Sequence, residues 1–505
     1  MAQTNSDIAF RLDRPLDEQT FKKVVADAGY SQTQLAKTLG LSSPHERQDL
    51  EVVYRRVKAD SPYNILVRLF RLGRKVDGAV FRQYLPGVDI ETLAAVGLLS
   101  RENGMVFSNV NLTPYHDLLL ASDFGPEINR QMSSDHVLGV GAASVTLAGL
   151  TVRRKVAKAL DLGTGAGIQA FLAARHTGRV IGTDTNLRAL NFAAFNARLN
   201  QIKGIEWRNG SFYEPVADEQ FDLIVSNPPY VISPESRFVF RDTDLPADAV
   251  SRQVLHGAGD RLSEGGLACV LFNWHHHDDA DWAARPLGWV SDTGCDSWLL
   301  CFKTADPLTY AADWLKTGEG RDSPDYGRYL DEWMAYYEKM GIGQISAGAM
   351  FIRKRSSEAN WSRSDKIEKG RTVGECGRQV ERIFAAEDLL RSLDDDRQLL
   401  DHRLIFDKHH LLEHQLTVEN GRWVVQVERL HTDKGISFSG RVDMYIANLL
   451  AGCNGCRTLR ELIKTVADRE QTDPEKFTSA CLGVVRKLMR SGFLSSVDVS
   501  GRADQ

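Results

Sequence analysis

A glycine-rich segment is the first feature of this sequence that could do chemistry. Asp161-Leu-Gly163-Thr-Gly165-Ala-Gly167 lies between an apolar run and the helical stretch IQAFLAARH. Glycines allow a tight turn there, and they let backbone N–H groups approach a ligand closely at the start of a helix. Alone, the segment is weak evidence, because a dehydrogenase or a structural strand-to-helix turn without a ligand has the same pattern.

Asp184 gives a second signal. It ends the next apolar run, GRVIGTD, 23 positions after Asp161. In a strand–helix–strand unit, this is where an acid faces the ribose hydroxyls of an adenosine-containing cofactor. Taken by itself, Asp184 could equally cap a helix, because TDTN precedes the helical run LRALNFAAFNARLN. The spacing from the glycine-rich segment favours cofactor binding.

A third motif, Ser226-Asn227-Pro228-Pro229-Tyr230, directly follows the strand-like run FDLIV. Two consecutive prolines make a stiff, extended backbone, so the Asn227 side chain and the neighbouring carbonyl groups point in fixed directions. The Asn227 side-chain oxygen and the Pro228 carbonyl could accept both N–H bonds of a planar amine, and Tyr230 could stack on it. The alternative is a rigid turn after the strand.

In this order and spacing, the three motifs resemble those of the class I S-adenosylmethionine-dependent methyltransferases, in their amino-methylating group with an Asn-Pro-Pro-Tyr motif. That group includes release-factor glutamine methyltransferases, adenine amino-methylating enzymes and small-domain ribosomal RNA guanine methyltransferases. The resemblance covers roughly residues 156–274. It implies S-adenosylmethionine as cofactor, and it implies the following roles. The methionine part is lined by Asp161, Gly163 and Gly165, in the loop that Gly167 completes. The ribose is held by Asp184. The amine is held by Asn227, Pro228 and Tyr230.

One segment departs from that family pattern. RNGSFYEP has Ser211 and Phe212 where many relatives carry an acid that contacts the adenine amino group. We expect adenine to meet Ser211 or the Phe212 backbone instead. An amide or exocyclic amine is a poor nucleophile, so the enzyme must orient it and stabilise positive charge on nitrogen. No dedicated general base is expected.

The order of apolar runs and helical stretches around these motifs predicts three regions. Residues 151–356 alternate apolar runs and helical stretches, which predicts an α/β, Rossmann-like doubly wound sheet. Residues 1–150 are predicted to be helical or winged-helix-like, because a helix at VDIETLAAVGLL precedes an alternating run with Asn103-Gly104 at a turn. Residues 371–505 are predicted to form an α+β domain, possibly a second winged-helix-like module. The polar interval 355–369 is interpreted as a linker.

The amino-acid composition and the net charge limit which classes of protein this chain could belong to. The 505 residues are 43% hydrophobic and 26% charged, which is typical of a soluble globular protein. The formal net charge of -5 gives no overall basic excess, so any nucleic-acid binding must be local. The seven cysteines are scattered, the N-terminus has no signal-peptide core, and no apolar run is long enough to span a membrane. We therefore expect a cytoplasmic protein without membrane association.

Two clusters could be mistaken for metal sites. His275-His276-His277 precedes Asp278 and Asp279, but three adjacent side chains cannot all face one ion, so a solvated loop is expected. The pair in Cys453-Asn-Gly-Cys456 has no second pair at zinc spacing, and a helix-ending turn is expected there. We predict no metal.

The methyl acceptor stays open at this point. Arg68, Arg71, Arg74 and Lys75 recur at helical spacing and could contact phosphates, although a solvated helix face is the plainer interpretation. Because the flanking regions look like nucleic-acid-binding modules, the main hypothesis is a base amine of RNA, or else of DNA. The alternatives are a glutamine amide in a protein, a small natural product, or a cofactor-binding protein that does not catalyse.

Overall fold

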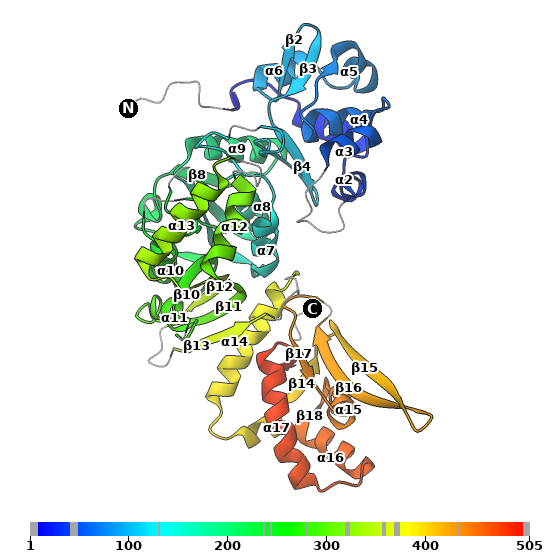
Figure 1. Cartoon of the computed structure of the whole chain (residues 1–505). Helices are drawn as coiled ribbons and strands as arrows, with labels where there is room; N and C mark the ends of the chain where they lie inside the picture. The colour runs from blue at the N-terminus through cyan, green and yellow to red at the C-terminus, as the bar shows by residue number, and fades with distance from the viewer. Residues whose placement is uncertain are drawn as a thin grey trace. The chain divides into compact units, whose positions relative to one another are not determined.

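The computed structural model describes residues 9–40, 49–129, 132–235, 238–242, 245–278, 280–318, 324–355, 360–367, 374–432 and 434–497. The chain divides into two compact units. The first comprises Met1–Ala148 and Arg154–Lys366, and the second comprises Gly149–Arg153 and Ile367–Gln505 (Figure 1). The glycine-rich segment and the Asn-Pro-Pro-Tyr motif both lie in the first unit.

An eight-stranded sheet forms the centre of the first unit, in the order β13-β11-β12-β10-β9-β6-β7-β8. The strands β8, β7, β6, β9 and β10 are parallel, whereas β12 is antiparallel to both of its neighbours. This is the Rossmann-like, doubly wound α/β arrangement that the sequence predicts. The bounds are β6 Val156–Leu162, β7 Thr177–Asp184, β8 Ile205–Asn209, β9 Phe221–Ser226, β10 Leu262–His276, β11 Cys295–Ala305, β12 Gln344–Lys354 and β13 Ser362–Lys366.

Helices pack on both faces of this sheet because its strands are apolar on both. One face packs against α10 (Ala249–Arg261), where Val254 meets Leu160 and Ile224 in one core cluster. The other packs against α8 (Ile168–Ala173), whose Ala170 shares a cluster with Val180. The chain leaves β6 toward β7 on one side and reaches β9 on the other, so the carboxyl ends of these strands border a crevice. Ligands bind at this point in open α/β sheets.

The predicted linker at 355–369 is wrong for its central part. Ser362–Lys366 forms β13, which pairs in parallel with β11 at the edge of the sheet. Trp361, just before it, is only 1% exposed, and the Trp298 indole N–H donates a hydrogen bond to Asp365 (2.7 Å). An edge strand can be polar because one of its sides faces solvent, so its composition resembles that of a linker. Residues 356–359, 368 and 369 lie outside the described part of the chain.

The N-terminal part of the first unit contains a winged-helix-like arrangement. Helix α6 (Ile90–Val96) is followed by the ribbon β2–β3 (Leu99–Glu102 and Met105–Ser108), which turns at residues 103 and 104 as the sequence predicts. With β1 (Val76–Asp77), the ribbon forms a sheet in the order β1-β3-β2. The other elements are α1 Glu18–Asp27, α2 Gln32–Leu39, α3 Leu50–Arg56, α4 Pro62–Leu66, a π-helical turn Val67–Arg71, α5 Gly78–Tyr84, β4 Asn111–Tyr115 and β5 Leu118–Ser122.

These N-terminal elements share a core with helix α9 (Leu187–Leu199), which packs on the central sheet. Phe10 stacks on Phe195 with ring centroids 3.8 Å apart, and its backbone exchanges two hydrogen bonds with the Asn191 side chain (2.8 and 2.9 Å). Both parts therefore belong to one compact unit. The domain boundaries at 150, 356 and 371 stay predictions.

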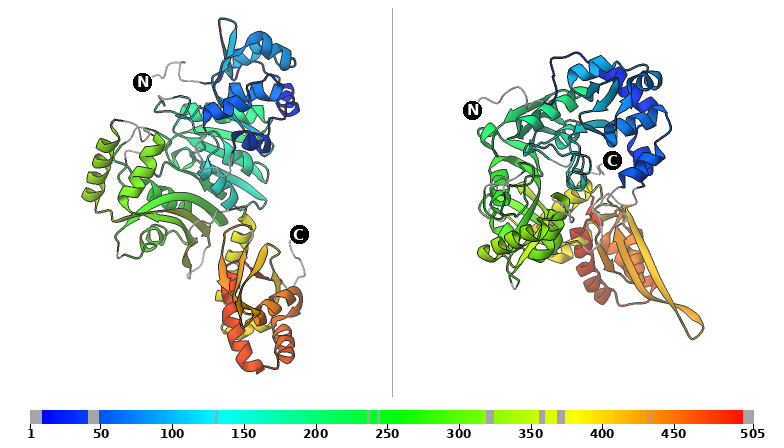
Figure 2. Two further views of the ribbon diagram at one scale, coloured as in Figure 1. Left: turned by 45° about the vertical axis from the view of Figure 1, so that its right-hand side comes forward. Right: turned by 45° about the horizontal axis from the view of Figure 1, so that its top comes forward.

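The second unit is α+β, as expected (Figure 2). Strand β14 pairs with both β18 and β19, and the order α15-β18-α16-α17-β19 around it is winged-helix-like. A separate antiparallel sheet has the order β15-β16-β17. The bounds are α14 Gly377–Ser392, a 3-10 turn Asp396–Asp401, β14 Arg403–Phe406, β15 His410–Glu419, β16 Arg422–Thr432, β17 Ser439–Arg441, α15 Met444–Gly452, β18 Asn454–Thr458, α16 Leu459–Arg469, α17 Pro474–Arg490 and β19 Leu494–Ser496.

Candidate active site

A cavity of about 370 Å³ opens at the carboxyl ends of β6, β7 and β9. Its volume is typical of a small-molecule site. Its walls include Asp161, Gly163, Gly165, Asp184, Ser211, Phe212, Asn227 and Pro228, which are eight of the predicted site residues. Two others, Gly167 and Tyr230, do not line it. Segments that are far apart in the sequence thus meet at one crevice.

The glycine-rich loop needs its glycines for two different reasons. Gly163, Gly165 and Gly167 have φ values of 72°, 53° and 93°, which residues with side chains rarely adopt. A side chain at Gly163 or Gly165 would meet only open space, so the backbone there is accessible from the cavity. At Gly167, which caps α8, a Cβ would lie 2.4 Å from the Phe171 ring. Gly167 therefore serves the packing of the helix.

Asp161 uses its carboxylate to hold the loop. It is 2% exposed, and its Oδ2 accepts hydrogen bonds from the Thr164 hydroxyl (2.6 Å) and from the Ala170 backbone N–H (2.9 Å). Burial raises the pKa of Asp161 to about 7, although these two hydrogen bonds act in the opposite direction. The side chain therefore ties the end of β6 to the first turn of α8 while bordering the cavity.

Asp184 joins the glycine loop to the start of α9. Its Oδ2 accepts a hydrogen bond from the Gly165 N–H, and its Oδ1 accepts one from the Asn186 N–H, both at 2.9 Å. Burial raises the pKa of this carboxyl as well. The capping residue of α9 is Asn186, so the cap interpretation of Asp184 does not hold. Each carboxylate oxygen keeps a further lone pair that could accept a ribose hydroxyl.

Asn227 presents an unused acceptor. Its Oδ1 is buried and has no hydrogen-bond partner among the described residues. The preceding residue is fixed, because the Ser226 hydroxyl donates to the Leu162 carbonyl (2.8 Å) and Ser226 pairs with β10. Pro228 is buried beside Asn227 in the same wall. This wall can accept an N–H group from a ligand.

Tyr230 does not line the cavity and packs instead against a neighbouring hydrophobic cluster. It packs against a cluster that includes Val231, Trp333 and Tyr337, and burial raises its pKa to about 12. Its predicted stacking on the substrate stays a prediction, and it would require Tyr230 to turn from this cluster toward the cavity.

Ser211 and Phe212 do line the cavity, after β8. Phe212 has a φ of 47°, a strained value for a residue with a side chain, and such strain is concentrated at ligand sites. The Gly210 N–H donates to the Asp184 carbonyl (3.2 Å), which brings this segment close to Asp184. Their contact with adenine stays a prediction.

Residues 136–144 form a wall of the cavity that the sequence motifs do not predict. This segment precedes β6, and its run of glycine and alanine, GVGAAS, is the only sequence signal that could have indicated a close approach to a ligand. The Val239 N–H donates to the Ser134 carbonyl (3.1 Å), and the Asn186 side chain donates to the Asp135 carbonyl (2.8 Å). The wall is thus attached to both sides of the crevice.

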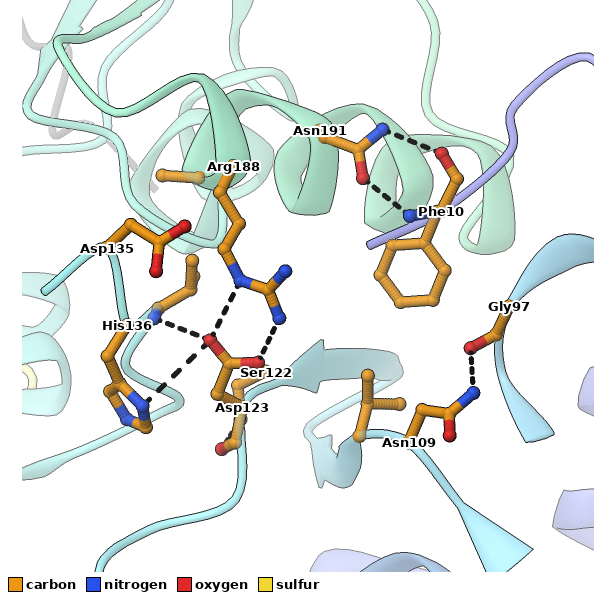
Figure 3. A network of polar contacts seen from close by, with 12 residues as sticks. Phe10, Gly97, Asn109, Ser122, Asp123, Asp135, His136, Arg188 and Asn191 are labelled. Carbon is orange, nitrogen blue, oxygen red and sulfur yellow. Dashed lines mark hydrogen bonds and ion pairs between the residues drawn. The ribbon is translucent and has the colours of Figure 1, made fainter. Parts of the chain in front are cut away.

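Figure 3 shows how the same wall is joined to the N-terminal part through Asp123. The Arg188 guanidinium donates to both Asp123 carboxylate oxygens (2.6 and 3.2 Å), and the Val137 N–H donates to Oδ2 (2.9 Å). His136 lies 3.9 Å from Asp123 Oδ2 and is 3% exposed; its pKa is lowered by burial. This network fixes His136 at the cavity wall.

The predicted helical stripe does not include Arg74 and Lys75, because the π-helical turn ends at Arg71, and the side chains of these cations are paired with protein groups. Arg68 pairs with Asp60 at 2.5 Å, while Arg74 and Lys75 form ion pairs with Glu51 and Glu102. Arg71 donates to the Asn111 side chain (3.4 Å). These cations contact protein groups, which weakens the argument for a phosphate-binding surface.

The two clusters that could be mistaken for metal sites are the run His275-His276-His277 and the pair Cys453 and Cys456. His275 and His276 end β10 and face Asp248 (3.7 Å) and the Ser346 hydroxyl (3.1 Å); they are mostly buried, so the expected solvated loop is wrong for them. Asp279 lies outside the described residues. After α15 ends, Cys453 is buried and Cys456 is exposed. Within the described ranges, no cluster of three metal-ligating side chains occurs, and no helix is long and apolar enough to cross a membrane.

Three families match separate parts of the chain. Residues 140–279 match the family described as methyltransferase small domain. Residues 27–109 and 381–496 match two families described as domains of unknown function, DUF7059 and DUF7782. The first match contains the glycine-rich loop, Asp184 and the Asn-Pro-Pro-Tyr motif.

Two of the curated proteins that this chain resembles are named for glutamine methylation. A release factor glutamine methyltransferase from Xylella fastidiosa is 45% identical over 126 residues, which are 23% of this chain and 46% of that protein. A ribosomal protein uL3 glutamine methyltransferase from Bradyrhizobium diazoefficiens is 30% identical over 165 residues, which are 30% of this chain and 52% of that protein. The chain therefore spans about half the length of these relatives.

A methyltransferase of known structure from Pyrococcus furiosus is 17% identical; the match covers 43% of this chain and 85% of that chain, with a TM-score of 0.28. The three motifs, the cavity that they line and the family match at 140–279 agree. Residues 140–279 therefore form a domain of the class I S-adenosylmethionine-dependent methyltransferase type, similar to the small-domain and release factor glutamine enzymes, and this similarity implies S-adenosylmethionine as methyl donor.

Proposed function

We propose that this protein transfers a methyl group from S-adenosylmethionine to the side-chain amide nitrogen of a glutamine in a protein. The observation that carries the proposal is the Asn227 Oδ1 atom, a buried acceptor in the cavity wall without a partner among the described residues. Such a group costs about 1–3 kcal/mol when left unsatisfied, and a substrate N–H would remove that cost. The Xylella and Bradyrhizobium relatives are both named for glutamine methylation, which favours an amide as the substrate.

The described residues fit the cofactor. Positive φ values at Gly163 and Gly165 open the backbone toward the cavity, and a side chain at either position would occupy that space. Asp184 borders the same cavity with oxygens that can accept hydroxyl groups. When bound, the cofactor supplies an electrophilic methyl group on a sulfonium.

The chain's own part in the reaction is to hold the amide. The lone pair of an amide nitrogen is delocalised, so the nitrogen is a weak nucleophile. The Asn227 side-chain oxygen and the Pro228 carbonyl would accept its two hydrogens, orient it, and stabilise the positive charge that develops on it. Orientation of this kind supplies roughly 7–11 kcal/mol of the barrier. As the N–C bond forms and the S–C bond of the donor breaks, the nitrogen would release one of its two protons to water, so the methylated amide would be neutral without a dedicated general base.

The RNA-base hypothesis has less support. The same pair of acceptors would hold an exocyclic base amine, but the basic stripe that suggested phosphate contacts is paired with Asp60, Glu51 and Glu102. The formal charge of -5 gives no compensating bulk attraction. A protein acceptor therefore accounts for more of the observations.

The test is transfer of labelled methyl from S-adenosylmethionine to purified, unmethylated release factor and ribosomal protein uL3, with total RNA as a third acceptor. We expect label on a glutamine, located by mass spectrometry, and none on RNA. Asn227→Ala should lower kcat about 100-fold or more, because removing one group that stabilises a transition state typically has an effect of this size. The Kd of the cofactor should stay unchanged. Asn191→Ala, which lies outside the cavity, is the matched control. Label on RNA alone would refute the glutamine assignment.

A further inference from the structure

The chain that follows the Asn-Pro-Pro-Tyr motif is held by tyrosines from an insertion in the sheet. We call residues 231–247 the acceptor loop, because it connects the motif to α10. At its start, the Ile232 N–H donates to the Tyr310 hydroxyl (3.1 Å), and the Tyr337 hydroxyl donates to the Ile232 carbonyl (2.8 Å). Both backbone groups of one residue are therefore satisfied by side chains.

The far end of the acceptor loop has a similar anchor. The Ala247 N–H donates to the Tyr336 hydroxyl (2.8 Å). The middle of the loop reaches the active site, because Val239 and Phe240 line the cavity. Tyrosines thus hold both ends of a loop whose centre borders the substrate space.

These tyrosines come from α12 (Pro307–Gly318) and α13 (Tyr326–Met340), the helices inserted between β11 and β12. Tyr310 is 7% exposed and Tyr337 is 1% exposed. The Asn273 side chain of β10 also donates to the Tyr310 hydroxyl (2.7 Å), which fixes that oxygen relative to the sheet. Burial raises the pKa of both tyrosines, so both hydroxyls stay neutral at physiological pH.

Asn227 lies in a short bridge between two fixed points. Upstream, Ser226 is the last residue of β9 and is paired with both β6 and β10. Downstream, Ile232 is bound by the two tyrosines. Two prolines between these points remove most of the remaining backbone freedom. The direction of the Asn227 side chain therefore depends on where Ile232 is held.

We propose that Tyr310 and Tyr337 are positioning residues for methyl transfer, and that they hold Ile232 so that Asn227 faces the acceptor amide. The catalytic part of this inference rests on the proposed function, whereas the clamp on Ile232 is a property of the fold alone. The tyrosines touch neither the reacting atoms nor the glycine-rich wall. Their loss should change kcat and the KM of the acceptor, and it should not change cofactor affinity.

The experiment compares Tyr310→Phe and Tyr337→Phe with Tyr326→Phe in the full-length protein. Tyr326 is on the same helix as Tyr337 and makes none of the bonds to the described acceptor loop, so it controls for loss of a hydroxyl. Hydrogen–deuterium exchange over residues 229–235 reports the clamp, titration with S-adenosylmethionine reports cofactor binding, and labelled-methyl transfer to release factor and uL3 reports turnover.

In Tyr310→Phe, we expect exchange of the Ile232 amide to rise about tenfold or more, because its hydrogen-bond acceptor is gone. In both clamp variants kcat should fall about tenfold, which corresponds to one hydrogen bond of about 1.4 kcal/mol, with the cofactor Kd unchanged within about twofold. Unchanged exchange in Tyr310→Phe would overturn the clamp, and normal turnover with raised exchange would overturn its positioning role. If the unmodified protein methylates neither acceptor, the proposed function fails, and the exchange measurement still decides the clamp.

Discussion

Replacing Asp184 by asparagine tests the prediction that this carboxylate, which holds the glycine loop, also binds the ribose of the cofactor. The carboxylate accepts the Gly165 N–H with one oxygen and the Asn186 N–H with the other. Asparagine keeps one acceptor oxygen, so one of these N–H groups would face an NH₂ group. A ribose hydroxyl that donates to Asp184, as we propose, would lose its bond to a charged group, which contributes about 1.5–3 kcal/mol. Since 1.4 kcal/mol is a factor of ten, S-adenosylmethionine affinity should fall about 10- to 100-fold.

The matched control is Asp222→Asn. Asp222 also accepts two backbone N–H groups, from Ala157 (2.9 Å) and Lys158 (3.0 Å), but it lies at the opposite end of β6 from the cavity and does not line it. Titration calorimetry should show weakened cofactor binding only for Asp184→Asn, while thermal unfolding reports the stability of both variants. Equal binding losses in the two variants, or normal binding by Asp184→Asn, would refute the role assigned to Asp184.

Two further predictions concern the glycine loop. Because burial raises the folded-state pKa of Asp161 to about 7, the folded protein binds more protons than the unfolded chain between about pH 4 and pH 7. Stability is therefore lost as pH rises through this window, and Asp161→Asn should flatten that decline in urea unfolding; an unchanged slope would contradict it. Gly167→Ala should destabilise the fold by about 1–3 kcal/mol, since its Cβ would lie 2.4 Å from Phe171. Gly163→Ala, whose Cβ meets nothing within 4 Å, should cost less, and equal losses in chemical denaturation would rule out the steric explanation.

The sheet and the glycine-rich side of the cavity could be predicted because their signals are local. Gly163 and Gly165 are needed for positive φ, and the two prolines after Asn227 stiffen the backbone, whatever surrounds them. Apolar runs that alternate with helical stretches require a covered parallel sheet. The sequence does not distinguish Gly167, which packs against Phe171, from the glycines that face the cavity.

The acceptor side depended on tertiary structure. The bond from Tyr337 to Ile232 joins residues 105 positions apart, and the Arg188–Asp123 ion pair spans 65 positions. Burial and partner choice at such distances are set by how helices pack on the sheet, which residue spacing does not encode. For the same reason, residue spacing could not show which acids lie beside the basic residues, and the fold pairs Arg74 with Glu51. By itself, the sequence indicated the methyl-donor chemistry and the Asn227–Pro228 pair proposed for the acceptor; only the tertiary structure decided which groups hold that pair in place, because those groups converge from separate parts of the chain.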